Sequence, residues 1–285
     1  MKHILLNEHL RSKFGERVQR ISLDPGFVCP NRTLKRGACI FCDEIGSASP
    51  WLRKGMTITE QLERGARFAF RRYKAKKYIA YFQAYTTTNA TAKELEKIYE
   101  EALLFPGVVG IAVSTRPDAI ADEVLCVLEK YSKKTYLWVE LGAQSMNDKS
   151  LVWMNRGHSS SVFSEAVKKL KNKGIEVVGH IIFGLPVEDK EEIIDSFNRF
   201  IATGVDGYKI HALHIIKGTK LAAMYEKSPF KLLNVDEYIF LVRKALELTP
   251  YGTIIHRLTG EVDETRLLAP KWILEKNDII RRILA

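Results

Sequence analysis

The chain has 285 residues, and its hydrophobic (46%) and charged (27%) fractions are those of a globular protein with one large α/β domain or two ordinary ones. No stretch approaches about 18 uncharged apolar residues, and the N-terminal region lacks an apolar run of signal-peptide length, so we expect no membrane span and a cytoplasmic location. The net charge of +10 is uneven, because residues 1–77 hold 17 Lys and Arg against 7 Asp and Glu and carry the whole excess. This asymmetry favours a polyanionic partner, nucleic acid first, with a merely solvated surface as the alternative.

Three of the four cysteines gather in residues 24–46 with the spacing C-x9-C-x2-C: Cys29, Cys39 and Cys42. Cubane iron–sulfur clusters are held by cysteine thiolates, normally four, so three protein ligands would leave one iron open to a small molecule. A structural zinc site is the alternative, but closed zinc sites want four ligands and no nearby His or second C-x2-C completes such a set. Unligated thiols are the third possibility.

The number and position of the cysteines indicate a reducing compartment and a metal site, because a disulfide framework would use more of them. The fourth, Cys126, lies among Val124, Leu125, Val127 and Leu128, and we expect it in the core.

After the cysteine loop, strand and helix patterns alternate. Strands are expected at residues 17–23, 78–84, 108–114, 135–141, 175–183 and 206–215, and helices at 57–73, 91–104, 120–131, 162–173 and 190–202. This order implies right-handed βαβ units and a parallel sheet, which six strands would curl into a partial (β/α)6 TIM-type barrel. Residues 1–216 would form this core. Residues 217–285 would form a C-terminal α/β extension packed on it, with helices at 234–248 and 270–283 and a strand at 253–258.

The helix at 57–73 begins with a capping-box pair, Thr57 and Glu60, and the next helix with Thr91 and Glu94. The apolar stripe of the helix at 57–73 is expected to contain Leu62, Ala66, Ala69 and Phe70. Cations crowd its other side and its end, and they are our candidate RNA-binding residues: Arg64, Arg67, Arg71, Arg72, Lys74, Lys76 and Lys77. Cations at a helix C-terminus also suit the helix dipole, so part of this cluster has a structural explanation.

Polar residues follow one strand after another, at the edge where parallel α/β folds bind ligands. Any one of them alone is better explained as a cap or a turn residue, but five consecutive polar strand ends favour a site. Acceptors such as Glu140 and Gln144 beside the cation Arg156 would suit a zwitterionic ligand that bears hydroxyls. A weaker alternative makes metal ligands of the scattered histidines: His158, His180, His211 and His214.

These stretches also carry a family resemblance: CPNRTLKRGACIFC, YFQAYTTTNA, VSTRPD, VELGAQS, NRGHSSS, GHIIFGLP, KIHALHIIKGTKLA and IHRLTGE. In them the chain resembles the radical SAM superfamily, and within it the Elongator-like branch and the YhcC/YtqA group, which includes the MnmL tRNA enzymes. The resemblance spans roughly residues 17–260. It implies a barrel of the radical SAM kind and a [4Fe–4S] cluster held by the three cysteines of the loop, with S-adenosylmethionine (SAM) on the open iron.

The resemblance also implies SAM contacts. Arg156 matches the carboxylate-binding arginine, and Ser114 and Gln144 match positions that reach the methionine and the ribose. Gln83-Ala84-Tyr85 stands where many relatives have a Gly-Gly-Glu stretch that holds the amino group, so the chain departs from the pattern there. The remaining matches are two adenine contacts and one position of less defined role: Phe41, Ile182 and Glu140.

The function that the resemblance implies is radical chemistry on tRNA. SAM cleavage, driven by an external electron donor, would begin the conversion of a 5-carboxymethylaminomethyl group on the wobble uridine to the aminomethyl form. One alternative keeps the radical chemistry but gives it a small-molecule substrate. Another is a zinc-bearing RNA-binding module without catalysis.

Overall fold

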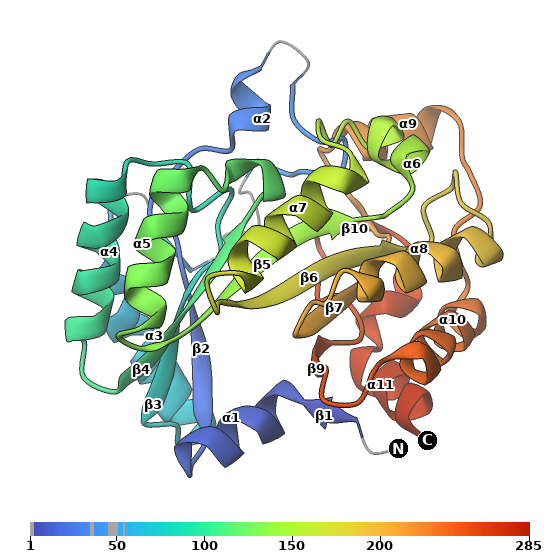
Figure 1. The fold of residues 1–285 in the computed structure, drawn as a ribbon. Helices are drawn as coiled ribbons and strands as arrows, with labels where there is room; N and C mark the ends of the chain where they lie inside the picture. Colours follow the sequence, from blue (N-terminus) through green and yellow to red (C-terminus); the bar gives the residue numbers. More distant parts are fainter. Residues whose placement is uncertain (1–2, 35–36, 45–50, 54) are drawn as a thin grey trace.

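The computed structural model describes residues 3–34, 37–44, 51–53 and 55–285. Four residues of the predicted cysteine loop, at positions 35–36 and 45–46, lie outside this description. The described chain forms one curled sheet with helices on its outer face (Figure 1). No helix in these ranges is both long enough and apolar enough to cross a bilayer.

The sheet of the described residues has eight strands, all parallel, which curl into a half-barrel. The six predicted strands are confirmed, and they occupy one continuous run of the sheet. From one edge to the other the order is β1 (Ile4–Leu5), β9 (Ile254–Arg257), β7 (Gly207–Ala212), β6 (Glu176–Phe183), β5 (Tyr136–Gln144), β4 (Val108–Thr115), β3 (Lys77–Phe82) and β2 (Val18–Leu23).

Two strands go beyond the predicted six. β9 comes from the predicted C-terminal extension, but it pairs in parallel with β7 and so extends the main sheet. β1 pairs with β9 and has only two residues, too few to show a periodicity in the sequence. A separate antiparallel ribbon joins β8 (Ile215–Ile216) to β10 (Leu267–Ala269). The main sheet therefore includes a strand from each side of the predicted boundary between core and extension at residues 216 and 217. That boundary stays a prediction.

In chain order the helices are α1 (Leu6–Phe14), α2 (Pro30–Thr33), α3 (Ile58–Tyr73), α4 (Ala92–Leu104), η1 (Pro117–Ala119), α5 (Asp122–Ser132), α6 (Asp148–Trp153), α7 (Ser160–Lys171), α8 (Lys190–Ala202), α9 (Lys220–Lys227), α10 (Val235–Leu248), η2 (Lys271–Leu274) and α11 (Lys276–Leu284). Helices α3, α4, α5, α7, α8 and α10 cover the outer face of the sheet, while α1 closes one end and α2, α6 and α9 lie at the other (Figure 1). The central strands β3 to β6 are nearly continuous in apolar residues, as expected for a parallel sheet buried on both faces.

Local sequence signals explain where several helices begin. Both predicted capping boxes are present, with Thr57 accepting from the Glu60 amide and Thr91 from the Glu94 amide. Two predictions of burial are wrong. Cys126 lies on the exposed face of α5, because the two residues on each side of it turn inward. Phe70 is 47% exposed although Ala69 beside it is buried, because each residue of a helix is turned by about 100° from the one before it.

The inside of the half-barrel is layered. Its floor is apolar, built from inward residues of the strands and sealed by Leu6 and Leu10 of α1. Above the floor lies a polar layer around Glu140, and above that layer opens a cavity at the carboxyl ends of the strands. In Figure 1, α1 marks the floor end and α2 the cavity end.

Candidate functional site

A cavity of about 810 Å³ opens at the carboxyl ends of the strands. This volume is within the range that takes a ligand the size of a nucleoside derivative. Three groups of residues line it: the cysteine loop after β2, the ends of the strands from β3 to β9, and residues 261–266 of the C-terminal region. The polar strand ends of the sequence therefore meet at one place.

The loop that carries the cysteines is fastened by the turn after α6. The Asn155 side chain donates to the carbonyls of Gly37 and Ala38, each at 2.9 Å, and the Ile40 amide donates to the Met154 carbonyl. Asn31 of the loop bonds to the same turn, because its Nδ2 donates to the Asn155 carbonyl at 2.9 Å. The same Nδ2 lies 3.4 Å from Cys39 Sγ. These bonds fix the loop against the turn after α6.

The three cysteines all line the cavity. A hydrogen bond from Cys42 lowers the pKa of Cys39 to about 5, with help from Arg156, although burial opposes it. The same bond and burial raise the pKa of Cys42. Among the described residues, no three His, Cys, Asp or Glu side chains converge on a point that would suit one metal ion. A closed zinc site needs such convergence, whereas each cysteine of a cubane cluster binds a different iron.

Several backbones around the cavity are strained. Tyr85, Gln144 and Asn155 have positive φ angles of 58°, 71° and 53°, in the left-handed region that non-glycine residues rarely adopt. Gly142 shows a different constraint, because an added Cβ would lie 2.6 Å from Nη2 of Arg156 and 2.5 Å from the Gln144 side chain. A glycine there lets Arg156 pack against β5 and donate to the Gly142 carbonyl at 2.8 Å.

Most of the residues that the sequence assigns to SAM line this cavity: Phe41, Gln83, Tyr85, Ser114, Gln144 and Arg156. Two do not. Ile182 is buried in an apolar cluster with Ile40 and Leu213. Glu140 is fully buried in the polar layer beneath the cavity, so the expectation that it is an acceptor at the mouth is wrong. Its carboxylate oxygens are already used inside the protein.

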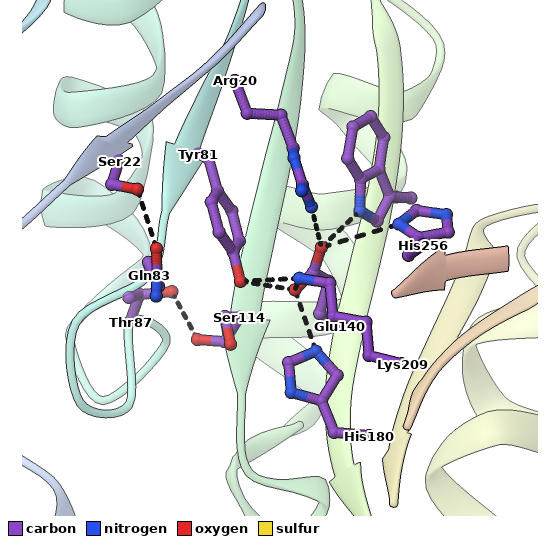
Figure 2. Close-up of polar contacts among 11 residues, drawn as sticks. Arg20, Ser22, Tyr81, Gln83, Thr87, Ser114, Glu140, His180, Lys209 and His256 are labelled. Atoms are coloured by element: carbon purple, nitrogen blue, oxygen red, sulfur yellow. Dashed lines mark hydrogen bonds and ion pairs between the residues drawn. The ribbon is translucent and has the colours of Figure 1, made fainter. Parts of the chain in front are cut away.

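Figure 2 shows the network around Glu140, which draws on strands across the whole sheet. One carboxylate oxygen accepts from Lys209 Nζ and from the Tyr81 hydroxyl, each at 2.5 Å, and lies 2.9 Å from His180 Nε2. The other accepts from Trp138 Nε1 at 2.9 Å and lies 3.9 Å from Arg20.

In this polar layer the cationic side chains outnumber the single carboxylate of Glu140. Burial alone would raise the pKa of Glu140, but Lys209, His180 and Arg20 together hold it well below its usual range. Burial lowers the pKa of Lys209 to about 7 against the attraction of Glu140, because Arg20 and Arg257 repel the same ammonium. Burial also lowers the pKa of His180 to about 4, so this histidine is neutral at pH 7. One carboxylate thus faces several cations.

The C-terminal region closes one side of the cavity over the cysteine loop. Arg266 Nη2 donates to Asp43 at 2.7 Å, and Lys217 donates through its amide to the Arg266 carbonyl. Val262 and Asp263 line the cavity beside this bridge. The sequence places this segment in the C-terminal extension packed on the core, and it assigns no role to Asn31 or Asn155. The available signals were that Asn155 precedes the predicted Arg156 and that Lys209 is a polar residue within the predicted strand at 206–215.

These observations fit a resident cluster and a bound zwitterion. Three thiols share one wall of the cavity, and the buried Nε of Arg156 has no protein partner. The model of the Radical SAM superfamily matches residues 25–200, and that of the Radical_SAM C-terminal domain matches residues 205–285. The chain therefore belongs to the radical SAM superfamily of enzymes. Its cofactors are a [4Fe–4S] cluster and SAM.

Within the superfamily the chain falls in the Elongator-like YhcC group. It is 38% identical to YtqA of Bacillus subtilis (strain 168), over 98% of this chain and 87% of that protein. Identity to YhcC of Escherichia coli (strain K12) is 37%, over 92% and 85%. Elongator complex protein 3 of Dictyostelium discoideum is 31% identical over 54% of this chain and 28% of that protein.

Solved structures agree on the fold. The archaeal Methanocaldococcus infernus Elp3 with an N-terminal deletion superposes with a TM-score of 0.70 at 19% identity, over 88% of this chain and 58% of that one. Streptococcus suis SuiB bound to SAM superposes with a TM-score of 0.51 at 14% identity, over 90% and 54%. At such identities the likeness concerns the fold alone.

The buried charge network generates a prediction about stability. Lys209→Met removes the main cation of a fully buried carboxylate, and we expect it to lower the free energy of unfolding by about 3–5 kcal/mol. Glu140→Gln combined with Lys209→Met should cost less than Lys209→Met alone, because no unpaired charge remains. Urea unfolding of the apoprotein measures both.

The exposed Lys244–Glu247 pair, 2.8 Å apart, is the matched control. Lys244→Met should change stability by less than about 1 kcal/mol. A cost for Lys209→Met no larger than for this control would mean that Glu140 does not depend on Lys209.

Proposed function

We propose that this chain is a radical SAM enzyme that acts on tRNA, converting a 5-carboxymethylaminomethyl group on the wobble uridine to the aminomethyl form. The observation that carries the radical part is the meeting of the three cysteines and the polar strand ends in one cavity. The tRNA part is supported by the resemblance to the YhcC group, by the Elongator relatives and by the basic N-terminal region.

In this proposal Cys29, Cys39 and Cys42 hold the cluster. When bound, the two cofactors supply the abstraction of a hydrogen atom from a C–H bond, after an external donor has provided an electron. Arg156 lies against β5 with its buried Nε free to bind a carboxylate, and the strained Gln144 lies beside it. Ser114, at the end of β4, would contribute to the same SAM site. The bridge from Arg266 to Asp43 keeps the C-terminal segment over the cavity and limits entry of water.

Three of the remaining proposed SAM contacts line the cavity, and the fourth does not. Phe41 and Tyr85 line the cavity, and Arg32 lies over the Tyr85 ring at 5.1 Å, which fixes this aromatic at the edge of the site. Gln83 also lines it and accepts from Ser22 at 2.8 Å. Ile182 reaches the site only through the apolar cluster beneath Phe41.

The basic face of α3 is the proposed contact with RNA. Six of its candidate cations are exposed: Arg64, Arg67, Arg71, Arg72, Lys74 and Lys76. The seventh, Lys77, begins β3, where it donates to the Phe14 carbonyl and pairs with Glu16 at 3.2 Å, so its role is partly structural. Phe68 and Phe70 are 62% and 47% exposed on the same helix. Exposed aromatics among cations suit nucleic acid, because bases stack on rings while phosphates bind cations.

The cluster prediction compares cysteine variants. Replacing any one of Cys29, Cys39 and Cys42 with Ala is expected to remove most of the iron and to abolish SAM cleavage, because thiolates hold such clusters. Cys126→Ala should change neither, because Cys126 is exposed on α5 far along the chain from the loop. Iron and sulfide content after anaerobic purification and the visible spectrum are the measurements. A cluster that needs Cys126 and tolerates loss of one of the three would contradict the assignment.

The function itself is tested on tRNA. A deletion strain should accumulate the 5-carboxymethylaminomethyl nucleoside and lack the aminomethyl form, and the purified enzyme with SAM and a reductant should restore it. Mass spectrometry of tRNA nucleosides measures both. Cleavage of SAM by the purified enzyme together with an unchanged nucleoside profile in the deletion strain would favour a small-molecule substrate.

The RNA prediction concerns the end of α3. Arg71→Glu with Arg72→Glu should weaken tRNA binding and slow turnover at sub-saturating RNA, while the cluster spectrum and SAM binding stay normal. Binding should also fall steeply as salt is raised, because phosphate contacts release counterions.

The control reverses the same amount of charge elsewhere. Lys168 and Lys169 are exposed on α7, and only Lys169 has an ion pair, a 3.8 Å contact with Asp122. Lys168→Glu with Lys169→Glu should leave tRNA binding near the wild-type value. If the two double variants weaken tRNA binding equally, binding depends on the net charge of the protein, and α3 is not a specific RNA-binding face.

A further inference from the structure

Arg257 at the end of β9 differs from the other cations of the cavity. Within the described residues, its guanidinium donates no hydrogen bond and forms no ion pair, although it lines the cavity. The other cationic side chains of the lining are all engaged: Arg32 with the Asp43 carbonyl, Arg116 with Asp118, Arg156 with the Gly142 carbonyl, Lys209 with Glu140, and Arg266 with Asp43. Arg257 is thus a donor in a confined space without a protein acceptor.

The nearby acidic groups do not supply the missing acceptor. Glu261 pairs with Lys276 at 2.8 Å, and Asp263 accepts from the amide and hydroxyl of Thr265. Glu140 is shared among Lys209, His180 and other donors of the polar layer. Glu140 and Glu261 attract Arg257 through space, but neither accepts a hydrogen bond from it. Its parallel N–H groups therefore stay available, and they match a planar carboxylate.

A second unpartnered donor or acceptor lies on the neighbouring strand. His211 of β7 lines the cavity, and its buried Nε2 has no hydrogen-bond partner. The register pairs Lys209 with Arg257, so His211 lies two residues farther towards the cavity on the strand beside Arg257. Burial and Arg257 hold the pKa of His211 well below its usual range, so the ring is neutral and has one N–H to donate.

This pair is separated from the proposed SAM-carboxylate residue. Arg156 packs on β5, and the sheet order places β6 and β7 between β5 and β9. Three strand spacings of about 4.8 Å put the two positions roughly 14 Å apart along the sheet. The two arginines therefore belong to different ends of the cavity.

We propose that Arg257 and His211 form a subsite for the carboxylate of the substrate, at the β7–β9 end of the cavity. This inference rests on the proposed function, in which the wobble side chain ends in a carboxylate that the product lacks. The carboxylate would pair with the Arg257 guanidinium and accept a hydrogen bond from His211. The subsite thereby selects the carboxymethylaminomethyl nucleoside over its uncharged analogues and over its own product.

The test measures binding without turnover. Holoenzyme with SAM and no reductant is titrated with an anticodon stem-loop that carries 5-carboxymethylaminomethyluridine at the wobble position, or with the same RNA carrying its methyl ester. Wild type should bind the acid about ten- to a hundredfold more tightly than the ester, the usual effect of a charge-assisted hydrogen bond. Arg257→Gln should remove this preference, Arg257→Lys should restore part of it, and His211→Phe should reduce it. SAM affinity should be unchanged in all three.

Three results would overturn the subsite. Equal binding of acid and ester by wild type does so without any variant, so poor folding of a variant does not protect the proposal. Loss of SAM affinity in Arg257→Gln would mean that Arg257 binds SAM and not the substrate. Equal weakening of acid and ester in that variant would make its role structural or assign it to a phosphate.

The proposed function fails by a different result, namely the absence of the aminomethyl product from wild type with reductant. If neither RNA binds, the acid and ester are compared as free nucleosides, and equal binding then overturns the subsite.

Discussion

The buried carboxylate of Glu140 is the interaction on which the inside of the half-barrel depends. It is fully inaccessible, yet it stays ionised because cations and donors from five other strands converge on it. Those groups are Arg20 on β2, Tyr81 on β3, His180 on β6, Lys209 on β7 and His256 on β9. A buried charge costs several kcal/mol unless it is paired, so each of these strands is tied to the position of the others. The partners of Glu140 also include the C-terminal strand β9, which joins the sheet directly.

This arrangement determines the charge of the cavity above it. A single carboxylate attracts Lys209, Arg20 and Arg257, and burial and the repulsion from Arg20 lower the pKa of Arg257 against this attraction. The β7–β9 end of the cavity therefore keeps an excess of positive charge that the protein does not neutralise. At the other end, Arg156 lies beside the thiols and donates to the Gly142 carbonyl. The cavity is thus divided between a cofactor end and a more cationic end, and the division comes from where the carboxylate is placed.

The sequence predicted the part of this structure that local patterns control. Six strands and two capping boxes follow from periodicity and cap residues, and the meeting of polar strand ends follows from parallel topology. The prediction for Glu140 is wrong because the alternation of apolar and polar residues shows only which face of a strand a residue is on. It does not show how far below the mouth of the barrel the residue lies. Cys126 was misplaced because its neighbours in the sequence are apolar, whereas a helix turns each residue by about 100°. β9 was assigned to a separate extension because a strand of four residues carries no information about its partner.

The position of α3 limits how an RNA would contact this molecule under the proposed function. The helix runs back towards β3, so its last turn lies at the amino ends of the strands, whereas the cavity opens at their carboxyl ends. With about 1.5 Å per residue, its 16 residues span roughly 24 Å. Arg71 and Arg72 are therefore at the far end from the chemistry, and Arg64 is nearer to it. A nucleoside that fills the cavity would leave Arg71 and Arg72 unused, whereas a folded RNA is long enough to contact both regions. Affinity for RNA and selection of the modified base would then reside in separate parts of the chain, α3 and the β7–β9 end of the cavity, and each is open to change without the other.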